Sequence, residues 1–214
     1  MKKQLLKEWL RSLSIGFTIF VAFSIYLFLR RGYYNLYIVN KVFGSTSAVL
    51  AGMTLLLGKL ATRFDVFDRY VVLRKPLGLL ALVLALAHVA ISLFFLPARF
   101  PLSWYLREIV PIAFGALAVL LWLYLAWISR TAAIKRLGAN LWRQRQSLGA
   151  RVAFVAVLAH LVIQKYPGWI RWWQGQVKAS PELAHPQYPP ASLFVFVIIL
   201  GILFYRGFFL GKRK

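Results

Sequence analysis

Six long apolar runs, each bounded by charged residues or proline, constrain this chain more than any other feature of its sequence. Each run is close to 20 residues long, which as a helix spans the roughly 30 Å hydrocarbon core of a bilayer. Backbone groups in lipid must bond within their own segment, so such runs form helices. The sequence therefore predicts an all-α integral membrane bundle, a single domain over 1–214, with six transmembrane helices at about 12–29, 42–60, 76–96, 109–128, 147–166 and 191–210.

The composition supports lipid as the main solvent. Apolar residues make up 61% of the chain and charged residues only 15%, whereas about a quarter of a soluble domain is charged. The 27 Lys and Arg flank the apolar runs and do not line one helix face, which argues against nucleic-acid binding. The chain has no cysteine, so disulfides, thiolate metal sites and iron–sulfur clusters are excluded. Any redox chemistry would need a bound cofactor.

The distribution of positive charge predicts the orientation. Nineteen Lys and Arg fall on the side that holds both termini, and eight fall on the opposite side. Because cytoplasmic loops carry the excess of Lys and Arg, we expect both termini in the cytoplasm of a multi-pass protein of the prokaryotic plasma membrane. The first run has a basic flank like a signal peptide but is too long for one, so we expect a retained helix. The segment 167–190 is expected to be an irregular outer loop, with a short interfacial helix around its tryptophans.

Two histidines lie inside the predicted membrane, His88 in the third span and His160 in the fifth. Both spans run from the cytoplasm outward, so the depths of the two residues can be compared directly. At 1.5 Å per residue they lie roughly 18 and 20 Å from the cytoplasmic end. The sequence thus places two imidazoles at one level, and an ionisable residue in a membrane span is a functional candidate by default.

Small residues share the helix face of each histidine. At spacings of three and four residues these include Ala81 and Ala85 before His88, and Ala153 and Ala156 before His160. Such stripes would leave room for a flat macrocycle with one imidazole on each side of its iron. They would also let helices pack closely, with each histidine bonded to a neighbour as a packed or proton-relay pair. A bare metal ion is the third possibility. His185, in the outer loop, is interpreted as a solvated residue.

Ordered motifs over about residues 40–166 resemble the ferric reductase-like transmembrane domain family, and within it the MsrQ (YedZ) branch. The third span opens with LRKPLG at 73–78, ten residues before His88, and the second opens with Gly44-Ser45-Thr46. Leu137-Gly138 and then Trp142 follow in a basic loop before the fifth span. Each motif is short, and the specificity of the resemblance comes from their order.

The resemblance implies a six-helix bundle that binds b-type haem between its third and fifth helices and carries electrons across the membrane. His88 and His160 match the family's outer haem ligands, with the four alanines beside them lining the slot. It also implies a cytoplasmic flavin reductase or a quinone as electron donor, and an outer-side redox protein, in the MsrQ branch a methionine sulfoxide reductase, as acceptor.

The inner level departs from the family pattern. Counting 13 residues back from His160 reaches Ser147, where the family usually has a second histidine, while Arg74 resembles an arginine of the MsrQ branch. The resemblance therefore implies one haem b, no imidazole for a second, and FMN or a quinone as a possible carrier at the cytoplasmic side. A basic cluster there could bind a phosphate or a reductase partner, or could simply set the topology. Its members are Arg74, Lys75, Arg136 and Arg143.

Two functions remain open. The first is a haem-bearing electron-transfer component of an oxidoreductase that is not itself a complete enzyme. The sequence stops four residues after the last span, so we expect it to borrow its electrons. The second is a cofactor-free membrane scaffold or transporter with the same fold and no redox role.

Overall fold

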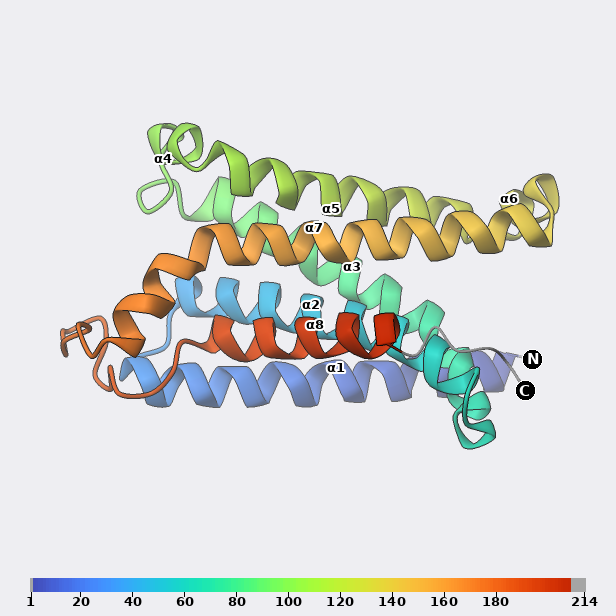
Figure 1. The fold of residues 1–214 in the computed structure, drawn as a ribbon, viewed down its shortest axis with the longest axis horizontal. Helices are drawn as coiled ribbons and strands as arrows, with labels where there is room; N and C mark the ends of the chain where they lie inside the picture. The colour runs from blue at the N-terminus through green and yellow to red at the C-terminus, as the bar shows by residue number, and fades with distance from the viewer. Residues whose placement is uncertain (1, 209–214) are drawn as a thin grey trace.

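The computed structural model describes the backbone of residues 2–208 and the side chains of residues 3–205. Several residues of the predictions lie outside this range. They are the last two residues of the sixth predicted span, the side chain of Arg206, and the cytoplasmic-side charges Lys212, Arg213 and Lys214. The described elements are helical, and the bundle they form is drawn in Figure 1. In chain order they are α1 (Lys2–Arg31), α2 (Leu36–Ala61), η1 (Asp65–Leu73), α3 (Arg74–Ala90), η2 (Ile91–Phe95), α4 (Leu102–Arg107), α5 (Ile109–Ile128), α6 (Thr131–Leu137), α7 (Ala139–Trp173) and α8 (Ala191–Phe208).

Five helical stretches within the described residues are long and apolar enough to cross a membrane: Lys3–Arg31, Leu36–Ala61, Asp65–Phe95, Ile109–Ile128 and Ala139–Trp173. They contain the first five predicted spans, except for the last residue of the third, and so confirm a multi-pass helical membrane protein. The sixth predicted span falls on α8, whose described apolar stretch Ala191–Tyr205 is shorter than the others.

The long helices run in alternating directions, so their ends gather at two ends of the bundle (Figure 1). The start of α1, η1 and α6 lie at one end, and α4 and the loop between α7 and α8 lie at the other. Among the described residues, the two sets of Lys and Arg counted from the sequence are thereby separated along the long axis. The first end is called the basic end below, and the second the loop end.

Helix α2 is the central element of the bundle. Half of its membrane-length stretch is buried by protein, against about a fifth for the other long helices. It packs on α1, α3, α7 and α8, and its closest neighbour is α3. Two small residues in its first half face α3 and allow this close approach: Gly44 lies against His88, and Ser47 bonds to the backbone of Ala81. The best buried side chains around it are Leu50, Leu77, Phe154 and Ile199, each fully excluded from solvent.

The second close pair is α5 with α7. A turn at Gly138, whose φ of 76° suits glycine, separates α6 from α7 and lets α7 return along α5. By contrast, α3 and α7 scarcely approach each other along their backbones. The bundle thus contains two helix pairs, α2–α3 and α5–α7, and each pair carries one of the two membrane histidines.

The outer-loop prediction is wrong at its start. Residues 167–173 were expected to begin an irregular loop with a short interfacial helix around its tryptophans, yet α7 continues through Pro167 to Trp173. The helix bends in its last turns (Figure 1), as expected where proline removes one backbone hydrogen bond. Trp169 anchors the bent segment because its ring is buried and its Nε1 donates to Ser192 Oγ at 2.9 Å. The tryptophans therefore lie on the last turns of α7 and do not form a helix of their own.

Candidate functional site

Each membrane histidine packs against a glycine of the other helix in its pair. His88 of α3 lies on Gly44 of α2, where an added Cβ would stand 3.3 Å from His88 Nδ1. His160 of α7 lies on Gly115 of α5, where an added Cβ would stand 3.0 Å from His160 Nδ1. Each glycine thus provides the space that its imidazole occupies.

Both imidazoles are held by the same kind of hydrogen bond. His88 Nδ1 is 2.9 Å from the carbonyl oxygen of Asn40, and His160 Nδ1 is 2.7 Å from that of Pro111. A carbonyl only accepts, so each Nδ1 carries the proton and the Nε2 of the neutral ring keeps its lone pair. In each case the accepting residue precedes the glycine by four positions, one helical turn. The same arrangement is built twice, once in each helix pair.

A second layer of contacts supports His88. Asn40 Nδ2 donates to Ser92 Oγ at 2.8 Å, and Ser92 Oγ donates to the carbonyl oxygen of His88 at 2.9 Å. Directly after this helical segment, η2 has π-helical hydrogen bonding, a distortion that is frequent at functional sites. The position of His88 is therefore fixed both at its ring and at its backbone.

The two imidazoles belong to α3 and α7, whose backbones scarcely approach each other. Both rings are partly exposed in the protein alone. The donor set consists of two neutral imidazoles with free Nε2 atoms, and two axial imidazoles are a donor set that haem iron accepts. Among the described residues no three His, Cys, Asp or Glu side chains come together in the manner of a metal-ion site.

The four alanines beside the histidines are buried by neighbouring protein. Their exposed fractions are 1% for Ala81, 6% for Ala85, 0% for Ala153 and 3% for Ala156. On α3, Ser47 Oγ of α2 donates to the carbonyl oxygen of Ala81 at 2.7 Å, so this part of the stripe packs on α2. These alanines serve close helix packing in the structure.

A similar arrangement of a polar side chain on a neighbouring helix recurs about four helical turns closer to the basic end. Arg74 lies across Gly58 of α2 and its Nε donates to the carbonyl oxygen of Thr54, four residues before that glycine, at 3.0 Å. Fourteen residues separate Arg74 from His88, and fourteen separate Gly44 from Gly58. Arg74 therefore occupies on α3 the inner place that corresponds to His88.

On α7 the corresponding inner residue is Gln146, fourteen residues before His160. Its Nε2 donates to the carbonyl oxygen of Leu125 at 3.0 Å and to Ser129 Oγ at 2.8 Å. Counting 13 residues back had pointed to Ser147, but the Ser147 hydroxyl instead accepts from Arg151 at 3.0 Å. A step of fourteen completes four helical turns more closely than thirteen does, so Gln146 shares the face of His160.

The inner basic cluster is not joined by hydrogen bonds. Arg74 is bound to α2, and Arg143 Nη2 donates to Asn140 Oδ1 at 2.6 Å within its own helix. Lys75 and Arg136 are exposed and have no hydrogen bond or ion pair within the described part of the chain.

A group of cations lies between the histidines and the loop end. Lys41 Nζ is 4.2 Å, and the Arg99 guanidinium carbon 3.7 Å, from the centre of the Tyr37 ring. Lys165 lies five residues after His160 on α7, toward the same end of the bundle. Within the described residues, neither lysine has a hydrogen bond or a carboxylate partner within 4 Å.

The loop after α7 is tied to this cation group. Arg99 Nη2 donates to Glu182 Oε2 at 2.7 Å, and Arg31 Nη1 donates to the Glu182 carbonyl oxygen at 2.8 Å. The hydrogen bond from Arg99 holds the pKa of the Glu182 carboxyl below its usual value. His185 is exposed and close to the Tyr188 ring, which agrees with a solvated loop residue.

Several of these partners were missed from the sequence. Gly115, Pro111 and Gln146 were not recognised because a single span does not reveal which residues of another span it faces. The signal that could have found them is a spacing of fourteen residues, which also separates the two accepting carbonyls of α5, Pro111 and Leu125. No model of a known protein family matches the chain, and no curated protein is significantly similar to it.

Proposed function

We propose that this protein is a b-type haem-bearing membrane subunit of an oxidoreductase, and that it passes electrons through the membrane to an outer-side partner. The observation that supports this most is the twofold arrangement of His88 and His160. Each ring is braced by a glycine and a backbone carbonyl, and each has Nε2 free to ligate. A histidine ligand commonly donates its other ring N–H to such an acceptor, which fixes its tautomer and orientation.

His88 and His160 would hold the iron, one from each helix pair. The carbonyl oxygens of Asn40 and Pro111 keep the Nδ1 protons in place, so Nε2 is the atom available to the metal. Lys41 and Lys165 place two positive charges on the loop-end side of the rings, where they suit the two carboxylates of a haem. When bound, the haem iron supplies one-electron transfer. The residues of the chain would bind it, orient it and balance its charge.

We further propose six spans with both termini in the cytoplasm of a prokaryotic plasma membrane. The sixth span is α8, and the basic end is the cytoplasmic end because it carries most of the Lys and Arg. The sequence resemblance to the MsrQ branch supports a cytoplasmic flavin reductase or a quinone as donor, and an outer redox protein such as a methionine sulfoxide reductase as acceptor. FMN or a quinone near Arg74 and Gln146 would bridge the inner level, where no imidazole is available.

The test is a quantitative haem assay on the purified full chain expressed with ample haem. We expect oxidised and dithionite-reduced spectra of a low-spin b-type haem near one per chain. His88→Ala and His160→Ala should each lose it, while His185→Ala is the matched control and should keep it. Lys41→Met combined with Lys165→Met should lower haem retention by about thirtyfold, since each lost charge pair contributes on the order of 1 kcal/mol. A colourless wild-type protein would refute the proposal.

A cofactor-free scaffold is the alternative that one observation favours. The alanine stripes are covered by neighbouring helices, and both histidines already have a hydrogen-bond partner. Under this alternative the two histidine variants would change the stability of the protein without any change in visible absorption.

A further inference from the structure

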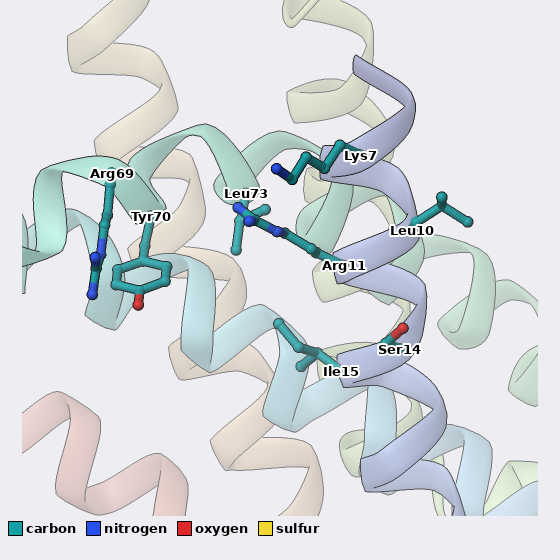
Figure 2. Close-up of a pocket in the computed structure, with 8 residues that line it drawn as sticks. All are labelled: Lys7, Leu10, Arg11, Ser14, Ile15, Arg69, Tyr70 and Leu73. Atoms are coloured by element: carbon teal, nitrogen blue, oxygen red, sulfur yellow. The ribbon is translucent and has the colours of Figure 1, made fainter. Parts of the chain in front are cut away.

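An open pocket lies at the basic end, away from the histidines. It has a volume of about 580 Å³ and lies between α1 and η1, and Figure 2 shows the side chains around it. From α1 it is lined by Lys7, Leu10, Arg11, Ser14 and Ile15, and from η1 by Arg69, Tyr70 and Leu73. The five α1 residues follow the spacing of one helix face, so the pocket runs along α1.

The pocket combines free positive charge with apolar walls. Within the described residues, Lys7, Arg11 and Arg69 have no carboxylate partner within 4 Å, and Arg69 contacts the ring of Tyr70 at 4.8 Å. The nearest acidic residues in sequence are Glu8, which accepts from Gln4, and Asp68. Leu10, Ile15 and the buried Leu73 form the apolar part of the lining. Three cations thus share a pocket whose remaining surface suits hydrocarbon.

The position of the pocket along α1 matches a membrane interface. Lys7 and Arg11 lie in the basic first turns of the helix, while Leu13 and Phe17, just beyond, are 47% and 69% exposed on the protein and have the hydropathy of a membrane span. Such cations stand at the depth of lipid headgroups, with the apolar residues of the pocket toward the acyl chains.

We propose that this pocket binds an anionic glycerophospholipid, with its phosphate held by Lys7 and Arg11 and its negative charge further balanced by Arg69, beyond the Tyr70 ring (Figure 2). Guanidinium forks match phosphate oxygens, and an attached acyl chain covers the apolar wall, which a soluble phosphate would leave exposed. Charge complementarity selects an anionic lipid over a zwitterionic one, whose phosphate charge is already balanced by its own headgroup. This inference does not depend on haem or on the proposed redox function.

The test measures lipid retention and thermal stability of the purified full chain in detergent. Phosphatidylglycerol, phosphatidylcholine and soluble glycerol 3-phosphate are added in separate titrations. We expect phosphatidylglycerol to stabilise the wild type at lower concentration than phosphatidylcholine, and glycerol 3-phosphate to have no effect. Arg11→Gln with Arg69→Gln should weaken the phosphatidylglycerol response by about tenfold, since each basic residue near a lipid surface contributes on the order of a fewfold change in affinity.

The matched control is Arg130→Gln with Arg145→Gln, which removes the same charge at the same end of the bundle from exposed residues outside the pocket. It should respond to phosphatidylglycerol like the wild type. If both double variants weaken the phosphatidylglycerol response equally, the lipid is attracted by the overall positive charge of this end and the pocket is not its site. If the wild type responds equally to the two lipids, the preference for an anionic lipid is wrong. Stabilisation by glycerol 3-phosphate alone would assign the pocket to a soluble phosphate. If the pocket variant fails to fold, Lys7→Gln, a change of an exposed side chain, replaces it.

Discussion

At the scale of single residues, the main result is that two histidines from different helices use the same three elements: a glycine on the partner helix, a carbonyl one turn before it, and a ring held through Nδ1. A carbonyl in a helix can accept a second hydrogen bond because it has two lone pairs. The arrangement therefore orients an imidazole without breaking the partner helix. It needs only a glycine at the right height.

This arrangement predicts the effect of Gly115→Ala. The new methyl group would stand 3.0 Å from His160 Nδ1, so the ring must move and its bond to Pro111 must lengthen. We expect a loss of about 1–3 kcal/mol in stability from overpacking, and a lower haem content with an altered reduced spectrum. Gly168→Ala is the control because an added Cβ there meets open space. A Gly115→Ala protein with unchanged haem content and spectrum would show that the glycine does not position the ring.

A second residue-scale prediction concerns acid. The Arg99 hydrogen bond lowers the pKa of Glu182, so the pair favours the docked loop above the usual pKa of 4.5 and this contribution is lost as pH falls through the lowered value. We expect amide exchange around Ser180 and Leu183, corrected for its intrinsic pH dependence, to accelerate at about pH 3 relative to pH 6. Glu182→Gln should exchange quickly at both values. A loop whose exchange does not change with pH would contradict this role for the pair.

At the scale of elements, α2 organises the bundle through its small residues. Gly52 lies where α2 meets α7 and α8, and an added Cβ would stand 2.6 Å from Ile202 Cδ1 and 3.0 Å from Phe154 Cζ. Both neighbours are buried, so neither can turn away into solvent. The packing of three helices therefore depends on the absence of one methyl group.

Gly52→Ala tests this packing. We expect it to destabilise the protein by about 1–3 kcal/mol, measured by unfolding in detergent. Ile202→Val removes the closer clash and should recover part of that loss, giving a coupling of roughly 1 kcal/mol in a double-mutant cycle. Gly201→Ala, next to Ile202 but facing open space, should change stability little. Additive effects of Gly52→Ala and Ile202→Val would mean that α2 and α8 do not meet as described.

At the scale of the whole molecule, the two helix pairs repeat the same side-chain-to-carbonyl contacts at two depths, although the residues that make these contacts differ. The outer level of both pairs has histidine, while the inner level has Arg74 in one and Gln146 in the other. Arginine and glutamine reproduce the hydrogen bond to the partner helix but are not haem ligands. The bundle keeps its packing at both levels and offers a pair of imidazoles only at the outer one.

The proposed orientation can be tested because the chain has no cysteine. Single cysteines are introduced at Gln176 in the loop after α7 and at Lys135 in α6, both exposed and at opposite ends of the bundle. With a membrane-impermeant maleimide on intact cells, we expect Gln176→Cys to be labelled at once and Lys135→Cys only after permeabilisation, because the basic end should be cytoplasmic. The reverse pattern would invert the topology, and labelling of both would contradict an odd number of spans between them.

The sequence by itself determined the class of the protein, most of its membrane helices and the separation of charge between its two ends. This is because about 20 apolar residues in lipid have no option but a helix that satisfies its own backbone. It also placed His88 and His160 at comparable depths, since depth follows from counting residues along a regular helix.

Only the tertiary structure decided which residues meet across helices. Gly44 and Gly115 as the supports of the imidazoles, Gln146 instead of Ser147 at the inner level, and the burial of the alanine stripes all depend on which helices pair. The continuation of α7 through Pro167 likewise depends on Trp169 packing near α8. A helix's own sequence sets its length and its faces, but the partner of each face comes from packing with segments far away in the chain.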